Sequence, residues 1–323
     1  MSAHFPAALP SASPSASPEA FGAAESHRAE LLAYCYRMLG SVHDAEDLVQ
    51  EVYLRAWRAR ESFEGRASLR TWLFRIATNA CLTALEQRRR RPLPAGLGAP
   101  SDDPEGPVAP PPDVPWLQPL PDRLVGGDPA SIVTARAGLR LALVAALQYL
   151  PPRQRAVLIL RDVLRLPAAE VAALLGVSVP AVKSLLQRAR TQLSEASPTE
   201  DTTVEPAAGR ELLDRYASAF ERADVEALTR LLTEDAVLEM PPTPTWFAGR
   251  SNIRRFLASR VLVEPGVHRM LPTAANGQPA AAMYDRRHFH AIMVLTVTPT
   301  AIARIVAFRD PSLYRPFGLP QTL

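Results

Sequence analysis

Polar and basic residues recur along residues 178–190 of the 323-residue chain at a spacing that puts most of them on one helix face. They carry hydroxyl, ammonium, amide and guanidinium groups, which are the donors that bind DNA base edges and backbone phosphates. The group consists of Ser178, Lys183, Ser184, Gln187, Arg188 and Arg190. Such side chains read a duplex when one helix presents them together, so the segment predicts a DNA-binding helix.

The residues around this group predict a helix-turn-helix. One helix is expected over 167–176 and a second from Val179 onward, with Gly176 in a left-handed turn conformation. Ser178 is placed to cap the second helix, and Val182 and Leu185 are expected to pack inward. A helical hairpin inside a bundle is the structural alternative, but the basic outer face favours DNA binding.

A second polar face lies on a helix predicted to begin after Ser68 and to end in four consecutive arginines. Arg75 and Asn79 stand one turn apart on it, and the loop before it carries Phe63. Arginines at a helix C-terminus also complement the helix dipole. A run from Arg88 through Arg89 and Arg90 to Arg91 exceeds what capping needs, so we expect phosphate contacts.

The helix expected over residues 43–57 has an acidic face opposite its apolar stripe. That face carries Asp44, Asp47, Gln50 and Glu51. A solvated surface would account for these residues, and on helix statistics alone it is the favoured interpretation. A docking surface for a basic partner is the functional alternative.

Composition bounds these interpretations. The chain is long enough for two or three domains, and a net charge of +3 with a pI near 9.1 permits a polyanionic partner without demanding one. Cys35 and Cys81 lie in apolar helical patterns and are expected to be reduced thiols in a cytoplasmic protein. No membrane-spanning run, metal-ligand spacing or cofactor motif is present in the sequence, so we expect no cofactor.

Proline divides the chain. Eleven of the 32 prolines fall between Pro92 and Pro121, which predicts a stiff linker over 93–135 that could span on the order of 100 Å. The other expected segments are a disordered tail over 1–25, helical blocks over 26–92 and 136–196, a short linker over 197–207, and a third block over 208–323.

The first two blocks resemble the extracytoplasmic-function (ECF) sigma factors, the promoter-recognition subunits of bacterial RNA polymerase. The resemblance rests on DAEDLVQEVYLRAW, on FEGRASLRTWLFRIATNACL, and on LPPRQRAVLILRDVLRLPAAEVAALLGVSVPAVKSLLQRARTQL, which occur in the family's order. It implies two all-α domains, sigma regions 2 and 4. The implied partners are core RNA polymerase, through its β′ clamp helices and β flap, and promoter DNA.

The resemblance also implies roles for the residues already singled out. The acidic face of 43–57 would bind the polymerase. Phe63 and Asn79 would hold a base flipped from the −10 element, while Arg75 and the arginine run hold its strand. The helix-turn-helix would read the −35 element, which lies two helical turns or roughly 70 Å away.

The third block predicts helices followed by an antiparallel sheet, an α+β pattern. It resembles the SnoaL-like group of the nuclear-transport-factor-like cone fold in EDAVLEMPP, in the W-F-x-G-R turn at 246–250 and in its closing strands. Relatives with this fold include enzymes. The candidate acid–base residues are Asp235, Glu239, His268, Asp285, His288, His290 and Asp310, which form no local catalytic signature.

SnoaL-like tails also occur fused to some ECF sigma factors, so we expect a regulatory block that folds back on the two sigma blocks or their linker, rather than an enzyme. The apolar PWLQPL stretch at 115–120 is its expected contact in the linker. Two alternatives stay open: a helix-turn-helix regulator that binds DNA without polymerase, and a SnoaL-like enzyme with a DNA-binding appendage. The sequence is compatible with either an inhibiting or an activating third block.

Overall fold

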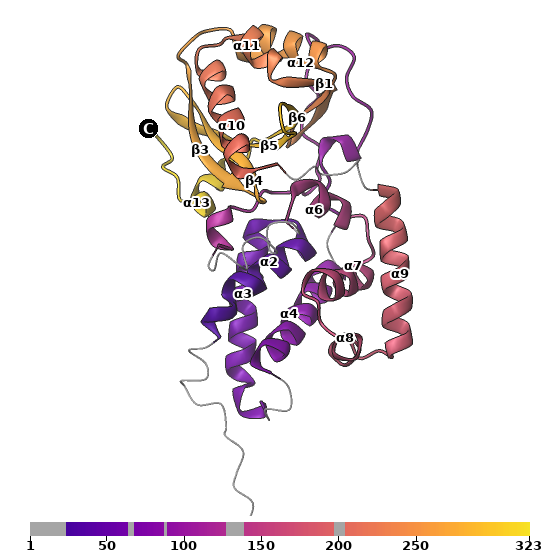
Figure 1. The fold of residues 1–323 in the computed structure, drawn as a ribbon. Helices are drawn as coiled ribbons and strands as arrows, with labels where there is room; N and C mark the ends of the chain where they lie inside the picture. Colours follow the sequence, from indigo (N-terminus) through magenta and orange to yellow (C-terminus); the bar gives the residue numbers. More distant parts are fainter. Residues whose placement is uncertain (1–23, 64–67, 87–88, 127–138, 197–203) are drawn as a thin grey trace, which may run out of the picture.

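The structure, a computed structural model, describes residues 24–63, 68–86, 89–126, 139–196 and 204–323 (Figure 1). Most of the expected N-terminal tail, Arg88, part of the loop after Phe63 and part of the second half of the linker lie outside these residues. The described chain forms two helical blocks beneath a third block built on a sheet (Figure 1).

The first block packs three helices: α2 (Arg28–Leu39), α3 (Val42–Arg58) and α4 (Leu69–Glu86). Gly40 ends α2 in the left-handed conformation, with φ of 70°. The Ser41 hydroxyl then accepts from the backbone N–H of Asp44 at 3.2 Å and caps α3. The backbone N–H of Thr71 donates to Ser68 Oγ at 3.1 Å, as expected for the cap of α4.

The second block contains α6 (Leu141–Leu147), α7 (Pro152–Leu158), α8 (Ala168–Leu175) and α9 (Val179–Ala196), with a π-helical turn, η5 (Ile159–Val163), after α7. Gly176 adopts the expected left-handed turn, with φ of 65°. Ser178 Oγ accepts from the backbone N–H of Ala181 at 3.3 Å at the start of α9. Val182 is fully buried and Leu185 half-buried, so the predicted helix-turn-helix is confirmed.

Two expectations from composition concern the helices. Cys35 and Cys81 are both buried and form no disulfide. Within the described residues, no single helix is long and apolar enough to cross a bilayer, although α8 and α9 satisfy that test as a pair bent by 99°.

The third block is α+β. Its helices are α10 (Pro206–Glu221), α11 (Val225–Arg230), α12 (Arg250–Phe256) with the π-helical turn η6 (Leu257–Val261), and α13 (Tyr314–Phe317). Its strands are β1 (Leu232–Met240), β2 (Thr243–Ala248), β3 (His268–Ala275), β4 (Gln278–Asp285), β5 (His288–Val297) and β6 (Ile302–Phe308), in the order β2-β1-β6-β5-β4-β3. The expectation of an antiparallel sheet was wrong at one place, because β1 and β6 pair in parallel.

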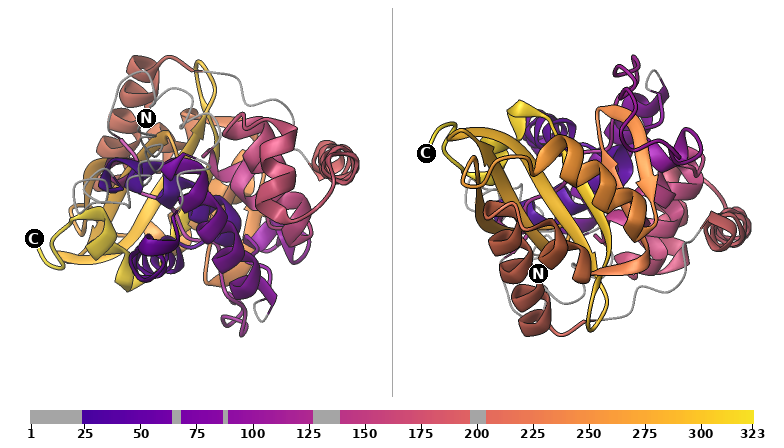
Figure 2. Two further views of the ribbon diagram at one scale, coloured as in Figure 1. Left: turned by 90° about the horizontal axis from the view of Figure 1, so that it is seen from below. Right: turned by 90° about the horizontal axis from the view of Figure 1, so that it is seen from above.

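Both faces of this sheet are apolar, and each belongs to a different core. Ala281, Met283 and Met293 face the helices of the third block. Ile292 and Val294, on the opposite face, join one continuous core with the first block, the linker and the second block. Successive strand residues point to opposite faces, so a third block standing alone would expose one apolar face to water. Figure 2 shows the sheet between these two layers.

The proline-rich segment is not an extended spacer in this structure. Leu117 and Leu120 are fully buried, and short 3-10 turns occur at η3 (Pro94–Gly96) and η4 (Asp122–Leu124). Proline removes backbone donors, but several of the remaining N–H groups bond to the neighbouring blocks: Gln118 N donates to Gly40 O at 3.0 Å and Ser101 N to the Trp246 carbonyl at 2.8 Å. The described part of the linker therefore packs between the blocks.

Candidate promoter and polymerase interface

The outer face of α9 is open. Lys183, Ser184, Gln187 and Arg188 are exposed there. Ser178 is also exposed, but its hydroxyl caps the helix. Arg190 is held in a bidentate pair, with its Nε and Nη2 atoms 2.9 and 2.7 Å from the two Asp162 carboxylate oxygens. The predicted DNA-reading residues thus share one surface, with one of the six already engaged by a carboxylate.

The polar face of α4 is open as well, with Arg75 and Asn79 exposed. Phe63 is half-buried and packs on Trp72, with ring centroids 5.0 Å apart. A helix rises 1.5 Å per residue, so Asn79 lies about 10 Å further along α4 than Trp72. The two predicted base-pocket residues therefore lie roughly two helical turns apart along α4.

The arginine run differs from its prediction. Helix α4 ends at Glu86, so Arg89 to Arg91 are not helical. Arg90 stacks over the Tyr149 ring, 4.1 Å from its centroid. Arg91 donates to Asp44 Oδ2 at 2.7 Å and to the Trp116 carbonyl at 2.9 Å. A residue expected to bind DNA is thus paired with a residue expected to bind polymerase.

Helix α3 presents a surface that sequence reasoning described only in part. Asp47 and Gln50 are exposed, while Glu51 pairs with Arg55 at 2.7 Å. Further along, Leu54 and Trp57 are 52% and 47% exposed, although both are large and apolar. Asp47, Gln50, Leu54 and Trp57 follow one another at three- and four-residue steps, a spacing that could have extended the predicted surface from the sequence. We call these four residues the α3 stripe.

The two helical blocks pack directly on one another. Helix α4 contacts both α7 and α8 (Figure 1). The buried Arg155 side chain donates to the Met38 carbonyl and, at 2.9 Å, to Gln148 Oε1. Burial lowers the pKa of Arg155 to about 10, which leaves it charged at neutral pH. This guanidinium ties α7 to the end of α2 through carbonyl and amide acceptors.

The turn between β3 and β4 joins all parts of the chain at Asn276. This residue is fully buried and has a positive φ of 57°, which asparagine tolerates. Its Oδ1 accepts from Leu120 N at 2.9 Å, and its Nδ2 donates to Tyr36 Oη at 2.8 Å and to the Leu139 carbonyl at 2.7 Å. One side chain of the third block thus holds the first block, the linker and the start of the second block.

Gln118, in the PWLQPL stretch, forms a second junction. Its side chain accepts from Ser41 Oγ at 2.6 Å and donates to Asp310 Oδ2 at 2.9 Å. Its carbonyl accepts from Tyr36 Oη at 2.8 Å. The expected contact of this stretch with the third block is therefore present, and it reaches the first block too.

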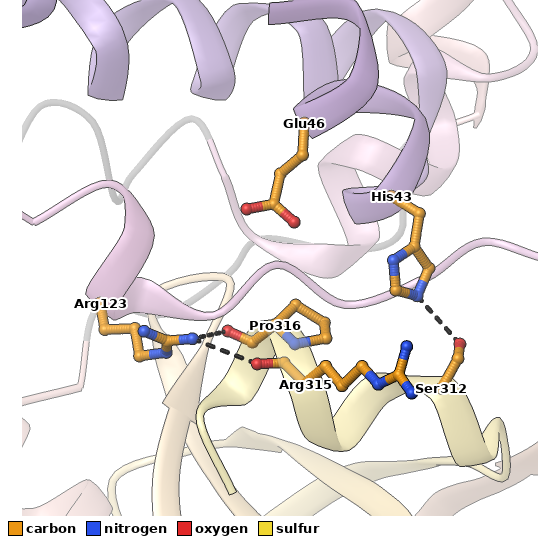
Figure 3. Close-up of a pocket in the computed structure, with 6 residues that line it drawn as sticks. All are labelled: His43, Glu46, Arg123, Ser312, Arg315 and Pro316. Carbon is orange, nitrogen blue, oxygen red and sulfur yellow. Dashed lines mark hydrogen bonds between the residues drawn. The ribbon is translucent and has the colours of Figure 1, made fainter. Parts of the chain in front are cut away.

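A groove of about 530 Å³ lies where α3 meets the C-terminal segment (Figure 3). His43 Nε2 is 2.9 Å from Ser312 Oγ on one side. Arg123 donates to the Pro316 carbonyl on the other, and Glu46 extends between them. The third block therefore contacts α3 at its N-terminal end, beside the acidic face, and leaves the α3 stripe uncovered.

The candidate acid–base residues of the third block are dispersed. His268, Asp285 and His290 line one cavity between the sheet and the helices of this block. Glu239 is buried outside that cavity, where it accepts from Arg304 at 2.5 Å and from the backbone N–H of Ala95 at 2.8 Å. The remaining candidates lie elsewhere: Asp235 and His288 are exposed, and Asp310 bonds to Ser312 and Gln118. Among the residues described, no three His, Cys, Asp or Glu side chains gather as a metal site.

Comparison with known proteins gives matches in all three blocks. The profiles that match are sigma-70 region 2 over residues 23–91, sigma-70 region 4 over 140–193, and the SnoaL-like domain over 213–310. The ECF RNA polymerase sigma factor SigG of Mycobacterium tuberculosis strain H37Rv is 52% identical over 308 residues, which are 93% of this chain and 83% of SigG. The probable ECF sigma factor SigI of the same strain is 26% identical over 311 residues, covering 91% and 94% of the two chains.

Among solved structures, the crystal structure of the M. tuberculosis ECF sigma factor SigJ aligns with a TM-score of 0.60 and 22% identity, covering 93% of this chain and 99% of SigJ. That likeness extends the shared fold over all three blocks. With two sigma regions in order and a 52% identical match to SigG over 93% of this chain, the protein belongs to the family of ECF RNA polymerase sigma factors.

Proposed function

We propose that this chain binds core RNA polymerase, directs initiation at its own set of promoters, and is held in a closed form by its SnoaL-like block. Polymerase binding and promoter-directed initiation rest on one observation: regions 2 and 4 occur together in a chain that is 52% identical to SigG. Sigma factors are not enzymes and act on the polymerase in the cytoplasm.

We assign each binding role to an exposed surface of the helices. The α3 stripe, with Asp44 and Glu51 beside it, binds the polymerase. Phe63, Arg75, Asn79 and the arginines after α4 hold the melted −10 strand, and the outer face of α9 reads the −35 element. The exposed side chains of Arg75, Asn79 and Gln187 suit those tasks. Arg91 takes part only when its pair with Asp44 opens.

The closed form is inferred by comparing the spacing of the promoter elements with the separation of α4 and α9. Promoter elements two helical turns apart lie roughly 70 Å from one another. Helix α8 packs on α4, and α9 packs on α8, so α9 lies within about two helix diameters, ~20 Å, of α4. Regions 2 and 4 cannot occupy both elements in this arrangement, and Asn276 and Gln118 hold it in place. Initiation therefore requires the blocks to separate, which makes the third block an inhibitor until its contacts are released.

Run-off transcription with purified core polymerase and a candidate self-promoter tests this function. The parent chain is compared with Asn276→Gly, which loosens the closed form without removing any block. Promoter-specific transcripts from either chain support the sigma function, and a more active variant supports the inhibition. Absence of both transcription and core binding would overturn the proposal in favour of a polymerase-independent regulator.

A further inference from the structure

A cavity of about 370 Å³ that is partly open to solvent lies in the third block, between its sheet and the helices α10 and α12. Its size is at the small end of the range of about 300–1,000 Å³ that is usual for ligand sites. Its walls are mainly apolar and aromatic, formed by Tyr216, Phe220, Leu238, Phe256, Met283 and Met293. We call it the cone cavity.

One wall of the cone cavity carries an unsatisfied hydrogen-bond acceptor. His268 is 9% exposed, and its Nε2 lies 3.1 Å from the carbonyl of Val261. A carbonyl can only accept, so in the neutral ring the proton lies on Nε2 and Nδ1 is left with a lone pair. Among the described atoms, this buried Nδ1 has no hydrogen-bond partner. The Asp285 carboxylate, another acceptor, is 3.8 Å away.

We propose that the cone cavity is a binding site for a compact, mainly apolar molecule with a hydroxyl group, which donates to His268 Nδ1. The apolar walls fit the body of such a molecule, and its hydroxyl supplies the donor that His268 Nδ1 lacks, beside the Asp285 carboxylate. A cationic ligand is disfavoured because Arg260 and Arg309 also line the cavity. Burial and the charge of Arg309 lower the pKa of His290, so this neighbour is neutral at neutral pH.

The linker forms the lid of this site. Val108 contributes to the cavity wall, and Arg260 donates to the Gly106 carbonyl at 2.9 Å. On either side of Gly106 in the chain, Ala109 N donates to Thr245 Oγ1 at 3.0 Å and Ser101 N donates to the Trp246 carbonyl at 2.8 Å. A ligand that fills the cavity gains contact with Val108 only while this segment is closed. It therefore stabilises residues 98–109 on the third block.

The binding test uses 2-naphthol as a probe, with 2-methoxynaphthalene as the matched compound without a donor. Isothermal titration on the full chain should show one site for 2-naphthol and about tenfold weaker binding of the ether. His268→Phe keeps the ring contact with Phe220 and should lose this preference, while Met293→Trp should abolish binding by filling the cavity. Thermal unfolding of each variant shows that it is folded.

Equal binding of the two compounds to the parent chain would overturn the assignment of the hydroxyl. No binding of 2-naphthol at 1 mM, or binding unchanged in Met293→Trp, would overturn the site itself. Hydrogen–deuterium exchange tests the lid: saturating 2-naphthol should slow exchange in residues 98–110 and leave α9 unchanged. Unaltered exchange at saturation would refute the lid. All readouts use the isolated chain, so their outcome is separate from polymerase binding.

Discussion

Replacing Asn276 by glycine should shift the chain from its closed to its open form by about two orders of magnitude. Glycine accepts the positive φ of this turn, so the backbone is not strained. The change removes three hydrogen bonds, each worth about 0.5–1.5 kcal/mol, for a loss of about 3 kcal/mol. All three partners lie outside the third block, so the loss weakens docking rather than the sheet itself. At 1.4 kcal/mol per factor of ten, this loss raises the ratio of open to closed molecules roughly 100-fold.

The assay is equilibrium binding of promoter DNA by the chain in complex with core polymerase, with solution scattering of the free chain beside it. The apparent promoter affinity should rise until it reaches that of the fully open form, because only the open form reaches both promoter elements. The radius of gyration should increase. Arg286→Gly is the matched control, since Arg286 also has a positive φ but is exposed in a different hairpin. If Asn276→Gly matches the parent chain in both measurements, closure through this junction does not govern promoter binding.

Three further predictions concern the exposed helices. Asp162→Ala should free Arg190 to contact a phosphate, so promoter affinity should rise. The slope of log K against log salt concentration should become steeper by about one. An unchanged slope would mean that Arg190 does not reach DNA. Phe63→Ala and Asn79→Ala should each reduce promoter opening about tenfold in permanganate footprinting while leaving core affinity intact, and normal opening in both would refute the base pocket. Trp57→Ala should weaken core binding about tenfold without lowering the melting temperature, since that ring is half-exposed; full affinity would remove it from the interface.

The sequence predicted the local structure well where one pattern dominated. The turn at Gly176 and the helix starts at Ser68 and Ser178 all occur where they were expected. Each depends on residues close together in the chain, such as a cap and its N–H three positions later. Periodicity and turn chemistry are sufficient for such features.

Features that depend on distant partners were not predictable in the same way. Arg91 carries an ordinary phosphate-binding side chain, and only the folded chain brings it to Asp44, 47 residues away. The strand β2 was missed because residues 246–250 were assigned to a turn, and its pairing with β1 supplies the stability that its own pattern lacks. The contact of the PWLQPL stretch was expected, but the compact path of the linker was not, because composition does not reveal a partner such as Asn276, which accepts from Leu120 N across 156 residues.

The continuous core shared by the sheet and the helical blocks has a consequence for synthesis. The strands that cover the linker and the first block are encoded last, between Ala275 and Phe308. At ~5–20 residues per second, a ribosome needs on the order of ten seconds to add the third block after the second is complete. During that interval the nascent chain carries finished promoter-reading helices that hold one another only through their own contacts, such as Arg155 with Met38. Each newly made molecule therefore passes once through a state without the contacts of Asn276 and the sheet, before its own C-terminal block adds them.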